Sequence, residues 1–119
     1  MSLLGLLRHM TFVEQIWFDV RFAGNDVIEY YRRPDDREVE WNELDSATLD
    51  EVVANFQCAC ETSDELARGH ALDELVQQPG AGWEPVNLYW IYLHMIEEYA
   101  RHCGHADLIR EMIDGTTGY

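Results

Sequence analysis

The feature that most constrains the fold is a long amphipathic pattern near the end of the chain, from Leu88 to Ile113. Read at about 100° per residue, the pattern predicts one helix with a single apolar face. Polar side chains share this face: His102 points into it, and Glu98 and His105 lie along one flank. The predicted apolar positions are Leu88, Ile91, Tyr92, Met95, Tyr99, Ala106, Ile109 and Ile113.

A carboxylate and imidazoles on the core-facing edge of a helix are costly to desolvate unless a partner pairs with them. A divalent metal ion is a suitable partner, because neutral imidazole and ionised carboxylate are ordinary ligands for it. Such spacings also occur on solvated helix faces, so a metal site and a solvated face both remain open at this point. His94 lies on the same flank but farthest from the apolar centre, and Glu97 and Arg101 are expected in solvent.

A second amphipathic helix is predicted at the start of the chain, over residues 2–22. His9 lies at the edge of its apolar stripe, so we expect the imidazole to point inward. Taken alone, His9 fits a core histidine bonded to a neighbour. Considered together with Glu98 on the other helix, His9 favours a metal site, because helix bundles build such sites in their cores. The stripe consists of Leu3, Leu6, Met10, Val13, Trp17 and Val20.

A third helix is predicted from about Ala47 to Arg68, with Thr48 and Glu51 as a capping box and Gly69 as its stop. Turn-rich segments at 32–37 and 77–82 separate the three helices. The chain has no repeat and no domain boundary, so we predict one all-α domain over residues 1–119.

Composition excludes several classes of partner. The net charge is −15, from 23 acidic and 8 basic residues, which argues against binding to nucleic acid or an anionic membrane. No apolar run approaches the roughly 20 residues of a membrane span, and no signal peptide is evident. The odd set Cys58, Cys60 and Cys103 forms no disulfide framework. We therefore expect a cytoplasmic protein with free thiols, and no catalytic role for Cys103, which projects away from His102.

Two quoted segments carry a family resemblance. The run Leu6-Leu-Arg-His9-Met and the run Glu98-Tyr-Ala-Arg-His102-Cys-Gly-His105-Ala-Asp-Leu resemble the DinB/YfiT-like superfamily, and more narrowly its uncharacterised actinobacterial mini-circle-protein branch. The resemblance covers nearly the whole chain. It implies an up-down four-helix bundle with a divalent metal held by His9, Glu98 and His102. His105 is implied as an additional ligand or as a group that contacts a ligand.

The resemblance also implies a function. Zinc or nickel is the first expectation for the metal, and iron or manganese also suits nitrogen and oxygen ligands. Three ligands leave room for a reacting group, so we predict a metal-dependent enzyme, a thiol-dependent transferase or isomerase with a low-molecular-weight thiol and an unknown small-molecule substrate. The alternatives are a non-catalytic protein that binds a metal or small molecule, and a bundle whose metal is structural or absent.

The family's bundle also raises the question of oligomeric state. Relatives begin with a helix ahead of the segment that opens this chain, so we expect only three long helices of the four-helix bundle. An apolar groove lined by Leu3, Leu7, Trp17 and Phe18 would then be exposed, and we expect a homodimer to cover it. The groove would also be covered if the natural chain started farther upstream, or if the middle segment of the same chain folded over it.

Overall fold

The computed structural model describes residues 1–26, 31, 39–42, 48–77 and 84–118. The turn predicted at 32–37 lies outside these residues, and so does the turn predicted at 77–82 except for Gln77. The described residues are all-α, with one isolated bridge between Leu75 and Asn87 and no strand among them. The predicted fold class is therefore confirmed. None of the described helices combines the length and the apolar character that crossing a bilayer requires.

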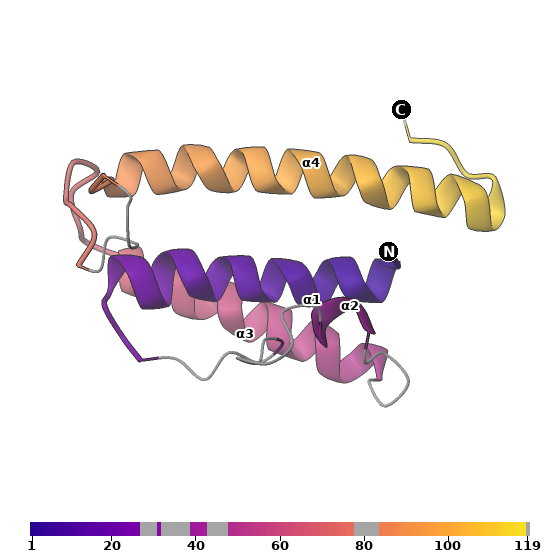
Figure 1. The fold of residues 1–119 in the computed structure, drawn as a ribbon, viewed down its shortest axis with the longest axis horizontal. Helices are drawn as coiled ribbons and strands as arrows, with labels where there is room; N and C mark the ends of the chain where they lie inside the picture. The colour runs from indigo at the N-terminus through magenta and orange to yellow at the C-terminus, as the bar shows by residue number, and fades with distance from the viewer. Residues whose placement is uncertain (27–30, 32–38, 43–47, 78–83, 119) are drawn as a thin grey trace.

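Three long helical rods pack together, with the first between the other two (Figure 1). The first rod is α1, Leu3–Glu14, which continues without a break into the π-helical segment η1, Gln15–Phe22. The second is α3, Leu49–Ala67, and the third is α4, Leu88–Asp114. A short helix that the sequence did not predict, α2, Val39–Asn42, packs against α1.

The ends of the helices follow the predicted signals. Thr48 and Glu51 form the capping box of α3, and each side chain accepts a hydrogen bond from the other residue's backbone N–H. Gly69 follows α3 with a φ of 82°, a left-handed conformation that glycine adopts without strain. The Asn87 side chain caps α4 by accepting a hydrogen bond from the backbone N–H of Trp90 at 3.0 Å.

The π-helical winding of η1 changes which side chains face the core. The backbone N–H of Ala23 donates to the carbonyl of Phe18, five residues back, at 3.0 Å. In this wider turn Phe18 and Phe22 are buried, whereas Val20 is only half-buried. Val20, which the α-helical period predicts to continue the inward stripe, is therefore less buried than Phe18 and Phe22.

The core lies between the first rod and the N-terminal half of α4, where Leu88 and Ile91 are almost completely buried. The prediction of an apolar face extending to Ile113 was wrong at its far end. There α4 runs past the start of α1, and Ile113 is 70% exposed (Figure 1). The buried core cluster is Met10, Phe12, Val13, Trp17, Phe18, Phe22, Ala67, Val76, Leu88, Ile91 and Met95.

Two residues expected to line an exposed groove are buried instead. The Trp17 ring lies 5.3 Å from that of Trp90, and the Phe18 ring lies 5.6 Å from that of Tyr92, centroid to centroid. Both Trp17 and Phe18 are therefore covered by α4 of the same chain. Leu3 and Leu7, the other two predicted members, are exposed and half-buried respectively.

Candidate metal centre

Three predicted ligands meet where α1 lies along α4. His9 comes from α1, and Glu98 and His102 come from successive turns of α4. One donor atom from each side chain lies within 4.8 Å of the other two, and all three residues are half-buried. The rings of His9 and His102 meet edge to face, with centroids 4.6 Å apart. The structure thus brings together residues that are about 90 positions apart in the sequence.

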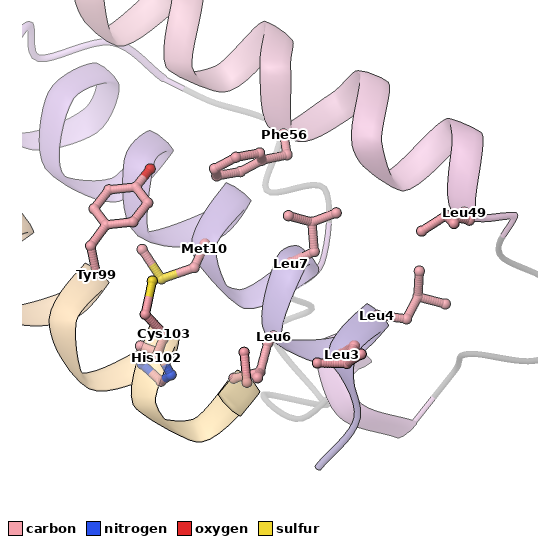
Figure 2. Close-up of a pocket in the computed structure, with 11 residues that line it drawn as sticks. Leu3, Leu4, Leu6, Leu7, Met10, Leu49, Phe56, Tyr99, His102 and Cys103 are labelled. Carbon is pink, nitrogen blue, oxygen red and sulfur yellow. The ribbon is translucent and has the colours of Figure 1, made fainter. Parts of the chain in front are cut away.

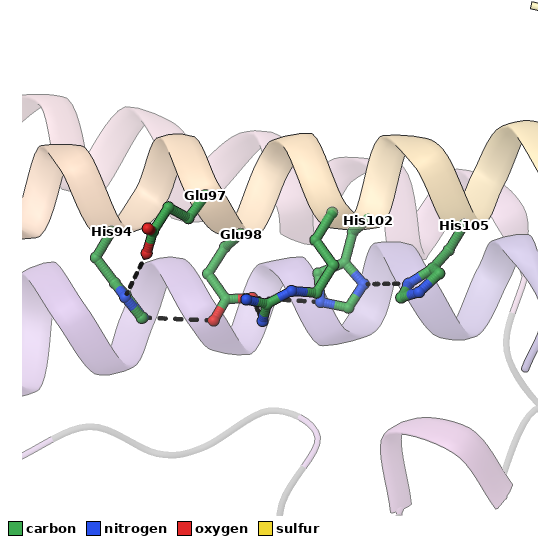
Figure 3. A network of polar contacts seen from close by, with 6 residues as sticks. His94, Glu97, Glu98, His102 and His105 are labelled. Carbon is green, nitrogen blue, oxygen red and sulfur yellow. Dashed lines mark hydrogen bonds and ion pairs between the residues drawn. The ribbon is translucent and has the colours of Figure 1, made fainter.

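The carboxylate of Glu98 lies between two histidines of its own helix. Its Oε2 atom lies 3.3 Å from Nε2 of His102, and its Oε1 atom lies 3.4 Å from Nε2 of His94. Figure 3 shows these contacts as a row along the side of α4 that faces α1. Only 14% of the Glu98 side chain is exposed, against 71% for Glu97, so one glutamate faces the site and its neighbour faces solvent as predicted.

His102 lies at the centre of this row. Burial, and next the positive potential of His9, lower the pKa of His102 below its ordinary value of 6.5. The imidazole is therefore neutral near pH 7, which is the form that binds a metal ion. Its Nδ1 atom lies 3.3 Å from Nδ1 of His105. His105 is thus placed behind His102 and outside the group of three converging donors.

His94 is held by aromatic packing, although the sequence left a solvent-facing position open. Its ring stacks on Trp90 at 4.9 Å with 9° between the planes. A second indole, Trp17, meets the ring edge-on at 4.6 Å. Only 21% of the His94 side chain is exposed. The histidine is therefore a fixed neighbour of Glu98.

Sequence reasoning missed Trp41, which comes from α2 and stacks on His9 with ring centroids 5.2 Å apart. Gly5 provides the space for this indole, because a Cβ atom at Gly5 would lie 2.9 Å from Cε3 of Trp41. The four-residue helix α2 is too short to show a period. The available signal was the glycine itself, since a glycine inside an apolar helical run often marks a close approach.

A partly buried hydrogen bond joins α1 to α4 one residue away from Glu98. The Tyr99 hydroxyl donates to the buried carboxylate of Glu14 at 2.5 Å. Burial, followed by this bond to Glu14, raises the pKa of Tyr99, so the phenol stays protonated and acts as a donor. The contact fixes the spacing of the helices that carry His9 and His102.

The three cysteines are free thiols, as the sequence predicted. Cys58 and Cys103 are exposed, and Cys60 is half-buried beside Tyr99, with 3.7 Å between its sulfur and the phenol oxygen. Burial raises the pKa of the Cys60 thiol. None of the three belongs to the group of converging donors.

The side chains present fit a divalent metal ion. Two imidazoles and one carboxylate supply nitrogen and oxygen donors that suit zinc, nickel, iron or manganese. The site is half-buried, and the neutral form of His102 is favoured. Three protein donors leave coordination positions for another molecule, as in catalytic zinc sites.

The fold and the site together define a helix bundle with a possible metal centre between its first and last helices. The family model described as Mycothiol-S-transferase matches residues 1–115. The chain therefore belongs to this DinB/YfiT-like, metal-dependent family, which confirms the resemblance to the DinB/YfiT-like superfamily. No curated protein and no solved structure gives a significant match.

Proposed function

We propose that this protein is a metal-dependent mycothiol S-transferase whose ion is held by His9, Glu98 and His102. The observation that carries the proposal is the convergence of these three donors within 4.8 Å, from two helices. Membership of a family named for mycothiol S-transfer supports the thiol substrate. Zinc and nickel are the first candidates for the ion, and iron and manganese are the further ones.

A divalent ion bound at this site would supply the Lewis acidity that holds a thiol sulfur as its thiolate near neutral pH. The residues of the chain provide the setting for that chemistry. Glu98 contributes a negative charge, while His9 and His102 donate neutral nitrogen lone pairs. His105 faces the Nδ1 atom of His102, which leaves Nε2 directed toward Glu98. We therefore assign His105 the role of orienting His102.

In the proposed reaction the thiol sulfur forms a bond to an electrophilic carbon of the acceptor. Either a carbon–carbon π bond breaks and the thiol proton ends on the adjacent carbon, or a leaving group departs with its bonding electron pair. In the second case the thiol proton passes to solvent. No oxidant or reductant is needed in either case.

We extend the proposal to the family branch, the cellular location and the oligomeric state of the protein. We place the chain in the mini-circle-protein branch, in the cytoplasm, and as a homodimer. Free thiols support the cytoplasmic location, since disulfides form mainly in oxidising compartments. Exposed apolar side chains on α4, among them Tyr89, Leu93 and Ile96, support the dimer.

Elemental analysis of untagged protein, combined with a transfer assay from mycothiol to a fluorogenic alkyl halide, tests the function. We expect about one divalent ion per chain, and activity that is lost with a chelator and restored by the metal. Glu98→Gln should lose metal and activity, whereas Glu97→Gln, the exposed neighbour, should retain both. A full complement of metal without thiol transfer would favour the non-catalytic binding protein, and absence of metal would overturn the proposal.

A further inference from the structure

A cavity of about 380 Å³ lies directly beside the candidate metal centre. Side chains from α1, α3 and α4 surround it, and His102 belongs to both the cavity wall and the group of converging donors (Figure 2). Its volume falls in the range of small-molecule sites, about 300–1,000 Å³. The cavity therefore offers room for a second molecule next to the position where a thiol would bind.

The wall of the cavity is almost entirely hydrocarbon. Five leucines, Met10, Phe56 and Ala106 form most of it, and Tyr99, His102 and Cys103 complete it. The Tyr99 hydroxyl is already engaged by the Glu14 carboxylate. Among the described residues, none of those in the wall is a lysine, arginine, aspartate or glutamate.

This uncharged wall belongs to a chain with 23 acidic residues and a net charge of −15. An ionic ligand would lose its hydration in the cavity and find no opposite charge in return. An apolar ligand, in contrast, gains roughly 0.8 kcal/mol for each methylene removed from water. The charge and chemistry of the wall thus favour a neutral, apolar occupant.

We propose that this cavity binds the acceptor substrate, and that the acceptor is a neutral electrophile with an apolar chain whose reactive carbon lies at the His102 end. The inference rests on the proposed S-transferase function and names the substrate class for it. For an activated alkene, a sulfur–carbon bond forms, the carbon–carbon π bond breaks, and the thiol proton ends on the neighbouring carbon.

Binding is tested first, without any reaction, by N-alkylpropanamides from propyl to octyl. Calorimetry should show the dissociation constant falling by about two- to fourfold per added methylene, up to the full 0.8 kcal/mol each, until the cavity is filled. Mass spectrometry gives the location: the octyl compound should slow alkylation of Cys103 by iodoacetamide. Cys58, which is also an exposed thiol but lies outside the cavity wall, should react at an unchanged rate.

Two matched variants test the wall directly. Cys103→Glu places a charge in the apolar wall on an exposed position of α4, and it should weaken octylpropanamide binding at least tenfold while the metal content stays constant. Cys58→Glu adds the same charge on α3 outside the wall and should leave binding unchanged. Equal affinities for the short and long chains, or equal effects of the two variants, would overturn the proposal.

Transfer to the matching N-alkylacrylamides by the metal-loaded protein then separates this proposal from the proposed function. Turnover that rises with chain length supports both. Turnover without dependence on chain length leaves the S-transferase function intact and overturns the apolar acceptor site. Chain-dependent binding without turnover overturns the function but supports the ligand class. Protection of Cys103 without ligand, lost on dilution, would show that a second copy fills the cavity and would overturn the proposal.

Discussion

The Nε2 atom of His94 lies 3.4 Å from Oε1 of Glu98, and the opposite oxygen of the same carboxylate faces His102 at 3.3 Å. Trp90 and Trp17 hold the His94 ring from two sides, so its position does not depend on the carboxylate. A ring fixed in this way can orient the carboxylate of a ligand, as partners of metal ligands commonly do. We infer that His94 positions Glu98.

Replacement of His94 by phenylalanine separates packing from positioning. His94→Phe keeps an aromatic ring between Trp90 and Trp17 but removes the nitrogen that faces Glu98. We expect metal affinity to fall about 10- to 100-fold, with little change in the free energy of unfolding of the metal-free protein. Competition with a chromogenic chelator measures the affinity. His94→Gln, which restores a donor, should recover part of the loss, and a phenylalanine variant with full affinity would exclude the positioning role.

We predict that His105 contributes less to metal binding than His102 does. His105 contacts Nδ1 of His102 at 3.3 Å, whereas His102 supplies one of the three converging donors. His105→Gln should therefore weaken metal binding about tenfold or less, and His102→Ala should abolish stoichiometric binding. Metal content after dialysis measures both variants. An equal or larger loss from the His105 change would show that His105 is itself a ligand.

Gly5 leaves the space that the Trp41 indole occupies when it stacks on His9. In Gly5→Ala the new methyl group would lie 2.9 Å from Trp41, so the indole must move away from α1. Alanine favours a helix over glycine by about 1 kcal/mol, so α1 itself should persist. We expect a shift in tryptophan fluorescence and a several-fold weaker metal affinity, because His9 loses its stacking partner. Unchanged fluorescence and affinity would indicate that Trp41 does not fix His9.

The candidate site could be predicted from local spacing, because the relevant information is contained within two helices. Glu98 and His102 are four residues apart, which places them on one side of α4 whatever the tertiary structure. His9 adjoins an apolar stripe that had to face the core. The resemblance to the family then predicted that the side chains of the two helices meet at one site. The pairing of His102 with His105 follows from the same spacing.

Other parts of the structure could not be predicted from the helical periodicity of the apolar residues. In the π-helical segment η1, Phe18 and Phe22 are buried where the period of a regular α-helix favoured Val20. Trp41 and His94 owe their positions to contacts between distant segments. The exposure of Ile113 depends on relative helix length, since α4 extends beyond the helix it packs against.

The stability of the metal-free protein should fall as the pH decreases through the range of His102. Its pKa in the folded protein lies below the ordinary 6.5, chiefly because the ring is buried. Below about pH 6.5 the unfolded chain therefore binds a proton on this histidine before the folded chain does, and unfolding becomes more favourable. Urea unfolding with a chelator at pH 7, 6 and 5 should show a smaller loss for His102→Gln than for the parent. Equal losses would mean that His102 is not responsible.

The proposed dimer can be assigned to one strip of α4. Tyr89, Tyr92, Leu93 and Ile96 are all exposed and fall within about 100° of arc on the N-terminal half of this helix. An exposed apolar strip of this kind commonly marks a protein contact. Two copies can cover the same strip on each other, as in a twofold interface.

Apolar burial at this strip has to overcome a net charge of −15 on each copy. Repulsion between exposed charges is screened over about 8 Å at physiological salt, and a stable interface buries about 800 Å² per subunit, so we expect association to prevail. Ile96→Glu should shift sedimentation at micromolar concentration from dimer to monomer. Leu108→Glu is the matched control: both residues are 63% exposed on α4, but Leu108 lies outside the strip and its variant should remain dimeric. A parent protein that sediments as a cooperatively folded monomer would show that three helices suffice without a partner.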